Sequence, residues 1–205
     1  MLIARVVALF SLVCLLVSAA SAGTIGPICA TCQGGIYELS YTPVSSDGTT
    51  DVYNVYFAVD TLAYTGPGLY IGAVAPKVSP NVTSAVLLSA SSGSVWDSPG
   101  GGLYANGCTS YTGGGFFCTA AIGNGAPISN HMNEWIWQVS IPSYTLFTGE
   151  NAARIKVMFT NDCEEKVGVL VSHSITLDSQ VPEPTTMGFL GAGLIGLYFI
   201  RRRLD

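Results

Sequence analysis

The stretch Asp51–Asp60, which reads DVYNVYFAVD, decides the fold that we predict for this chain. Its large apolar residues recur at every second position, so an extended chain collects them on one face. These residues are Tyr53, Val55, Phe57 and Val59. A second stretch, WIWQVSI at residues 135–141, alternates in the same way and places both tryptophans on its apolar face. This period of two, rather than 3.6, predicts β-strands that bury one face.

Further stretches have the composition of strands, and turns such as Ser46-Asp47-Gly48 and Asn124-Gly125 separate them. They are Ile36–Tyr41, Leu69–Val78, Ala85–Ala90, Phe116–Ala120, Arg154–Phe159 and Val167–Leu177. Between them we find no pattern of an amphipathic helix. Seven or eight short strands predict an all-β domain, an antiparallel β-sandwich with a jelly-roll-like topology, and a small barrel is the alternative. The segment 91–115 is rich in Gly and Ser, and we expect an irregular loop there.

The first 22 residues have the pattern of a secretory signal peptide. Arg5 precedes an apolar segment at residues 6–17, and Ala20-Ser21-Ala22 is an A-x-A cleavage motif. We therefore expect signal peptidase to cut after Ala22, so that the mature chain begins at Gly23. This pattern predicts export.

The last 25 residues combine three kinds of sequence in order. Val181, Pro182, Glu183 and Pro184 form a polar segment that the prolines keep extended. Residues 185–200 carry no charge, and as a helix they would cover about 24 Å of the ~30 Å hydrocarbon core of a bilayer. The basic end consists of Arg201, Arg202 and Arg203. We expect a single transmembrane helix at residues 185–200, with the arginines snorkelling on the cytoplasmic side.

This order of elements resembles the PEP-CTERM sorting signal of Gram-negative bacteria, which the membrane enzyme exosortase recognises. Pro182-Glu183-Pro184 matches the Pro-Glu-Pro element, and the apolar run and the arginines match the other two parts. The resemblance implies a precursor anchored transiently in the inner membrane, whose tail exosortase removes. It further implies release to the cell surface or the extracellular matrix, with exopolysaccharide or biofilm as the expected surroundings. The chain thus divides into residues 1–22, 23–180 and 181–205.

The central domain, residues 23–180, is also similar to other small PEP-CTERM proteins. The resembling features are an early Cys-x-x-Cys, the block from Asn106 to Cys118, and a Trp-rich strand followed by Leu146-Phe147-Thr148-Gly149. The resemblance brings no assigned activity with it. We therefore expect a non-enzymatic surface or matrix protein without a cofactor or a bound metal.

The charge balance of the domain argues against nucleic acid as a partner. Its four bases, set against eleven acids, give a net charge near −7, whereas phosphate contacts require clustered basic residues. The bases are Lys77, Arg154, Lys156 and Lys166.

Five cysteines remain after the signal peptide, and an exported chain can form disulfides. Two pairs and one leftover can be chosen in 15 ways. We favour Cys108–Cys118, which would staple the glycine-rich loop, together with Cys29–Cys32. Cys163 is then unpaired, or an alternative partner of Cys29 or Cys32.

Chemical sites are weakly indicated. A thioredoxin-like interpretation of Cys29-Ala30-Thr31-Cys32 requires a helix after a strand, but Gln33-Gly34-Gly35 follows it. His131 and His173 lack the spacing of zinc ligands. A secreted hydrolase is a less favoured hypothesis, for which paired carboxylates would come from Glu134, Glu150, Glu164 and Glu165.

Aromatic residues near the glycine-rich segment suggest an alternative function. Trp96, Tyr104 and Tyr111 fall in this segment, and exposed rings in loops are how many carbohydrate-binding modules hold sugars. A carbohydrate-binding module is therefore the alternative to a purely architectural matrix protein.

Overall fold

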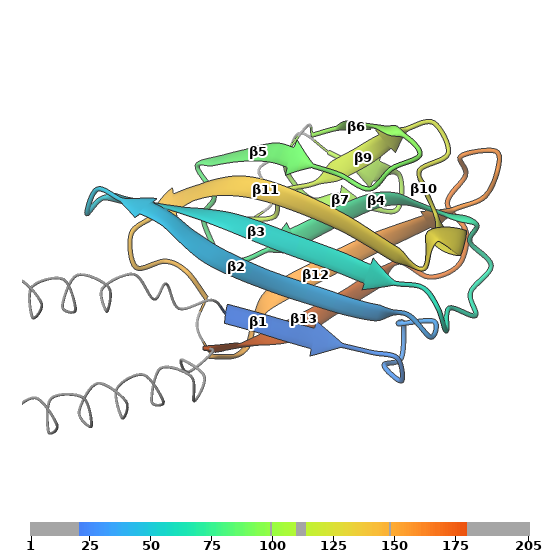
Figure 1. Ribbon diagram of the computed structural model, residues 1–205, viewed down its shortest axis with the longest axis horizontal. Helices are drawn as coiled ribbons and strands as arrows, with labels where there is room; N and C mark the ends of the chain where they lie inside the picture. Colours follow the sequence, from blue (N-terminus) through green and yellow to red (C-terminus); the bar gives the residue numbers. More distant parts are fainter. Residues whose placement is uncertain (1–20, 99, 110–113, 148, 180–205) are drawn as a thin grey trace, which may run out of the picture. The chain divides into compact units, whose positions relative to one another are not determined.

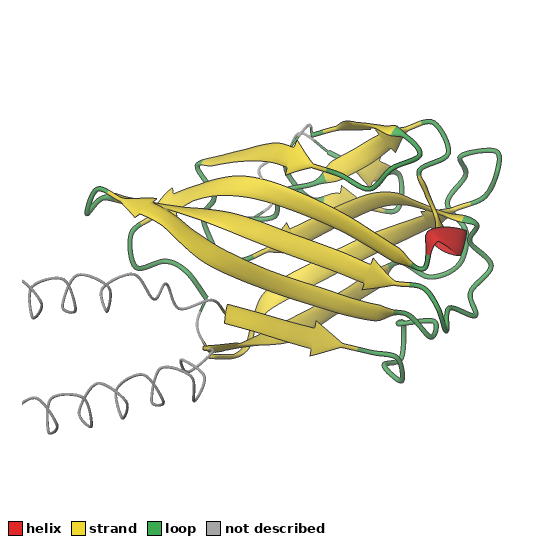
Figure 2. Cartoon of the chain, viewed as in Figure 1, coloured by secondary structure: helices red, strands yellow, loops and turns green. Residues whose placement is uncertain are grey.

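The computed structural model describes residues 21–98, 100–109, 114–147 and 149–179, in which antiparallel β-strands are joined by turns and loops (Figure 2). The strands are β1 (Ser21–Ile25), β2 (Ile36–Ser46), β3 (Thr50–Asp60), β4 (Tyr70–Lys77), β5 (Ser84–Ser89), β6 (Val95–Asp97), β7 (Leu103–Tyr104), β8 (Gly107–Cys108), β9 (Thr119–Ile122), β10 (Ala126–Pro127), β11 (Met132–Pro142), β12 (Gly149–Thr160) and β13 (Val171–Ser179). A short 3-10 turn, η2, covers Ile128–Asn130. Within the described ranges, no helix has the length and apolar character needed to cross a membrane. The predicted transmembrane segment, residues 185–200, lies outside these ranges.

The strands form two layers that β1 and β13 connect along one edge (Figure 1). One layer has the order β5-β11-β3-β2-β1, and the path continues through β13-β12-β4-β9-β6, with β10 paired to β4. β1 pairs with β2 on one side and with β13 on the other, through Ser21 and Ala22. The path ends at β5 and β6 without closing. The described strands therefore make an open, sandwich-like fold rather than the small barrel considered above.

The core between the two layers confirms the alternation read from the sequence. In β11 the residues Trp135, Trp137, Val139 and Ile141 are at most 1% exposed. Trp135 pairs with Phe57 in β3, which is also fully buried. The layer that contains β12 contributes alternating residues to the same hydrophobic core, among them Ile155, Val157 and Phe159. Burial of each such side chain contributes roughly 1.5–3 kcal/mol, so this cluster is the main source of stability.

The expectation of an irregular loop at residues 91–115 is wrong, because β6, β7 and β8 lie within it. The β7–β8 hairpin packs on the face of β4 that is turned away from the main core. Leu103 of β7 is fully buried there in a second, smaller cluster with Ala73, Ala75, Cys118 and Met158. These strands have two or three residues each, too few to show a hydrophobic period.

Candidate functional site

Three of the four basic residues of the domain lie together on one surface of β4 and β12. Lys77 of β4 is paired directly with Arg154 of β12, and Lys156 follows two positions later. Directly paired residues share a face of a sheet, as do residues two apart. Ile155, between the two basic residues of β12, is fully buried in the main core. The three cations therefore lie on the opposite face.

Aromatic rings surround the two lysines. The Nζ atom of Lys77 lies 5.5 Å from the ring centroids of both Phe116 and Phe147. The Nζ atom of Lys156 lies 4.7 Å from the centroid of Phe116 and 5.2 Å from that of Tyr104. These distances are within the ~6 Å range of cation–π attraction. The lysine–aromatic cluster, as we call it, consists of Lys77, Arg154, Lys156, Tyr104, Phe116 and Phe147.

Backbone contacts and a disulfide hold the rings of this cluster in place. Phe116 forms an isolated β-bridge with Lys77, and two residues later Cys118 is bonded to Cys108. The backbone N–H of Phe147 donates to the carbonyl oxygen of Val78 at 2.8 Å. The disulfide predicted to staple the glycine-rich segment therefore also fixes an aromatic ring beside both lysines.

The electrostatics of the cluster are unfavourable for the protein alone. Burial lowers the pKa of Lys77, and the positive charge of Arg154 lowers that pKa further. The same two causes, in the same order, lower the pKa of Lys156. Like charges directly opposite each other on paired strands destabilise a sheet. An anionic ligand would relieve this repulsion, so the cluster has the chemistry of a site for carboxylate or sulfate groups.

The structure separates the aromatic residues that the sequence had grouped. The ring of Trp96 in β6 packs edge-on against Trp135, with a centroid distance of 5.2 Å, and its Nε1 donates to the carbonyl oxygen of Ser91. Tyr104 is 51% exposed and belongs to the lysine–aromatic cluster. Tyr111 lies outside the described residues. Sequence reasoning noted the scarcity of bases but missed their convergence, which depends on the pairing of β4 with β12.

The structure contains both favoured disulfides. Cys29 is bonded to Cys32, with Cα atoms 5.1 Å apart, and Cys108 is bonded to Cys118, with Cα atoms 5.7 Å apart. Cys163 is free and exposed in an Asx turn, where its N–H donates to Oδ1 of Asn161.

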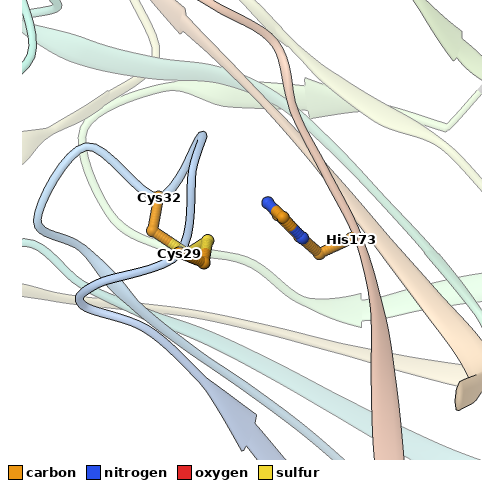
Figure 3. A group of neighbouring side chains, drawn as sticks. All are labelled: Cys29, Cys32 and His173. Carbon is orange, nitrogen blue, oxygen red and sulfur yellow. A yellow bond between two sulfur atoms is a disulfide. The ribbon is translucent and has the colours of Figure 1, made fainter.

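A second group of side chains lies at the Cys29–Cys32 disulfide (Figure 3). The two Sγ atoms and a ring nitrogen of His173 all lie within 4.8 Å of one another. His173 comes from β13, and its Nε2 is 2.7 Å from the hydroxyl of Thr31, inside the Cys-x-x-Cys loop. In the described ranges no other three or more His, Cys, Asp or Glu bring potential ligand atoms so close together, and here the disulfide bond leaves no thiolate to bind a metal. Sequence analysis missed this group because His173 is far from the two cysteines in the chain and no motif spacing connects them. Strand pairing brings His173 to the loop.

The carboxylates considered for hydrolysis lie on different parts of the fold. Glu134 of β11 accepts a hydrogen bond of 2.7 Å from the hydroxyl of Tyr56. Glu164 and Glu165 lie in the exposed turn after β12, where Asn161 organises the backbone. The side chain of Glu150 is not described.

The processing segments precede and follow the described fold in the sequence. Of the residues at the predicted signal cleavage, Ala22 and Gly23 belong to β1, whereas Ala20 is outside the described residues. The sorting residues also lie outside them; they are Val181, Pro182, Glu183, Pro184, Arg201, Arg202 and Arg203. Their structure is therefore not part of the site geometry.

Comparisons with known proteins agree with the sequence interpretation of the tail. Residues 180–203 match the family described as PEP-CTERM protein-sorting motif. No curated protein and no solved structure matches the chain. The chain therefore carries a PEP-CTERM protein-sorting motif, the tail by which exosortase sorts exported proteins.

Proposed function

We propose that the protein is a non-enzymatic component of the cell surface or extracellular matrix, where the lysine–aromatic cluster binds an acidic exopolysaccharide. The observation that carries the proposal is the convergence of three cations in a domain that has only four. A sorted, exported protein meets the polysaccharide of its own cell first. A polymer with uronate or sulfate groups would supply the negative charges that the cluster lacks.

The proposed processing removes only a small part of the described fold. β13 ends at Ser179, and the matched sorting motif begins at residue 180. Removal of the tail near Pro182-Glu183-Pro184 therefore spares every strand that the structure describes. Cleavage after Ala22 leaves Gly23, Thr24 and Ile25 paired with β2, but it removes Ser21 and Ala22, the two residues through which β1 pairs with β13. The signal peptide, the transmembrane helix at residues 185–200 and the jelly-roll-like topology belong to this proposal as predictions.

The chemistry of the cluster favours an acidic polymer over a neutral one. Tyr104 offers an exposed ring for stacking on a sugar. The charge of Lys156 lies over this ring, and Lys77 and Arg154 add charge on the same face of the sheet. An exposed ion pair is worth about 0.2–1 kcal/mol, so a single contact is weak. A polymer that presents many repeats gains apparent affinity through multivalency. Binding should accordingly weaken as the salt concentration rises.

The experiment compares a polyuronate with a neutral glucan in an affinity assay on the domain from Gly23 to Ser179. We expect binding of the polyuronate, with an affinity reduced about 1.4- to 5-fold in Lys77→Gln and in Arg154→Gln, from the value of one exposed ion pair. Lys166→Gln changes the net charge equally but lies in the exposed turn after β12, and it should bind as the wild type does. Equal loss in all three variants would contradict a local site. Binding of the neutral glucan alone would indicate instead the carbohydrate-binding module with aromatic contacts.

A further inference from the structure

We propose that the Cys29–Cys32 disulfide is exchange-active, with His173 as the group that protonates the sulfur released when a thiolate attacks it. The site takes a thiol of a small molecule or of another protein as its substrate. It is separate from the lysine–aromatic cluster, and the inference does not rest on the polysaccharide proposal.

Burial decides which sulfur an incoming thiolate can reach. Cys32 is fully buried, whereas Cys29 is partly exposed. Attack on a disulfide follows access, among other factors, and the other sulfur leaves as a thiolate. The geometry therefore directs the attack to Sγ of Cys29, and Sγ of Cys32 is the leaving group.

A thiolate released in a buried site needs a nearby cation or proton. Desolvation disfavours the charged form of a buried thiol, which would slow departure of Cys32. His173 has a ring nitrogen within 4.8 Å of both sulfur atoms (Figure 3). The hydroxyl of Thr31 contacts Nε2 of the ring at 2.7 Å and so fixes the imidazole beside the loop. Imidazole is a common proton donor in such steps.

The chemical steps balance as ordinary thiol–disulfide exchange. The thiolate RS⁻ forms a bond to Sγ of Cys29, the Cys29–Cys32 bond breaks, and the Cys32 sulfur takes a proton from His173. A second thiolate then attacks the sulfur of the bound R group, the bond from that sulfur to Sγ of Cys29 breaks, and the Cys29 thiolate and His173 each take up a proton from the solvent. The products are the Cys29 and Cys32 dithiol and the disulfide RSSR, so two thiols are oxidised while one protein disulfide is reduced.

The second disulfide of the domain provides an internal control. Cys108 is partly exposed and Cys118 is 1% exposed, so this pair has the same burial pattern as Cys29 and Cys32. The group of His173 with two sulfur atoms occurs only at Cys29–Cys32 among the described residues. A difference in exchange rate between the two disulfides thus reports on the surroundings of the sulfur atoms, not on access alone.

The experiment measures the opening of each disulfide in the folded domain by glutathione, followed by alkylation and peptide mass spectrometry. We expect Cys29–Cys32 to open faster than Cys108–Cys118. His173→Asn keeps a polar side chain beside Thr31 but cannot donate a proton as imidazolium does, and we expect it to slow opening of Cys29–Cys32 by about tenfold or more. His131→Asn is the matched control and should leave both rates unchanged.

Two results from the wild type and His173→Asn would overturn the proposal. One is an unchanged rate of Cys29–Cys32 opening in His173→Asn. The other is opening of both disulfides only when the domain unfolds, as monitored by circular dichroism in the same samples. If His173→Asn itself perturbs the fold, the Cys108–Cys118 rate changes too; Thr31→Val, which removes only the hydroxyl contact to His173, then decides. An unchanged Cys29–Cys32 rate in Thr31→Val would likewise contradict the assigned role of a fixed imidazole.

Discussion

Replacing Arg154 with glutamine should make the domain more stable, although it removes a charged residue from the proposed binding surface. Arg154 is exposed and is paired across strands with Lys77. Its charge lowers the pKa of both Lys77 and Lys156. Both shifts mean that the folded state disfavours the charged lysines. Without Arg154 the charge repulsion on the two lysines disappears, whereas the cost of burying their charges remains.

The size of the expected gain in stability follows from the direct pairing of Lys77 with Arg154. Side chains on directly paired residues bring two charges to roughly 5–8 Å apart, which in water corresponds to about 0.5–0.8 kcal/mol of repulsion. At physiological ionic strength the Debye length of ~8 Å reduces this to about 0.2–0.4 kcal/mol. At low salt the removal of this repulsion in Arg154→Gln should raise Tm by roughly 1–3 °C for a domain of this size.

The assay is thermal unfolding followed by circular dichroism at low and high salt. Lys166→Gln is the control, because it changes the net charge by the same amount and has Asp162, Glu164 and Glu165 as sequence neighbours. Removing Lys166 should leave Tm unchanged or lower it. The reasoning is refuted if Arg154→Gln is no more stable than the wild type at low salt, or if Lys166→Gln gains as much. A variant that is stabilised but binds polyuronate less well cannot be explained by misfolding.

Three further predictions concern stability and sorting. Trp137→Ala, in the main core at 1% exposure, should cost about 3–5 kcal/mol in chemical denaturation, whereas Leu88→Ala, at 54% exposure, should stay within about 0.5 kcal/mol; similar costs would refute the core assignment. Asp51 accepts hydrogen bonds from the hydroxyls of Ser46 and Ser143, which lower its pKa from 3.8, so its stabilising contribution is present above pH 3.8 and is lost as the pH falls through the lower folded value. Asp51→Asn should therefore have a lower urea midpoint than the wild type at neutral pH, and the difference should vanish in acid; a difference independent of pH would contradict this cause. Deleting Pro182-Glu183-Pro184 should retain the protein in the inner membrane of its host, as measured by fractionation and intact mass, and release of the deleted form would refute the sorting role.

The sequence by itself determined the fold class, the main core and the sorting tail. Strand alternation is a local property, and a one-residue shift would move every buried side chain of β11 to the other face. The apolar faces of β3 and β11 could therefore be assigned before any pairing was known. The sorting motif is likewise contiguous, and the match at residues 180–203 falls where the tail was recognised.

The tertiary structure alone decided what the chain brings together from distant positions. The convergence of Lys77 with Arg154 depends on the pairing of β4 with β12, which lie more than seventy residues apart in the chain. The approach of His173 to Cys29 and Cys32 depends on the placement of β13 beside the first strands. The short strands β7 and β8 form because Leu103 finds a buried place on Ala73 and Ala75. Each of these features comes from non-local contacts, which leave no periodic signal in the segments that make them.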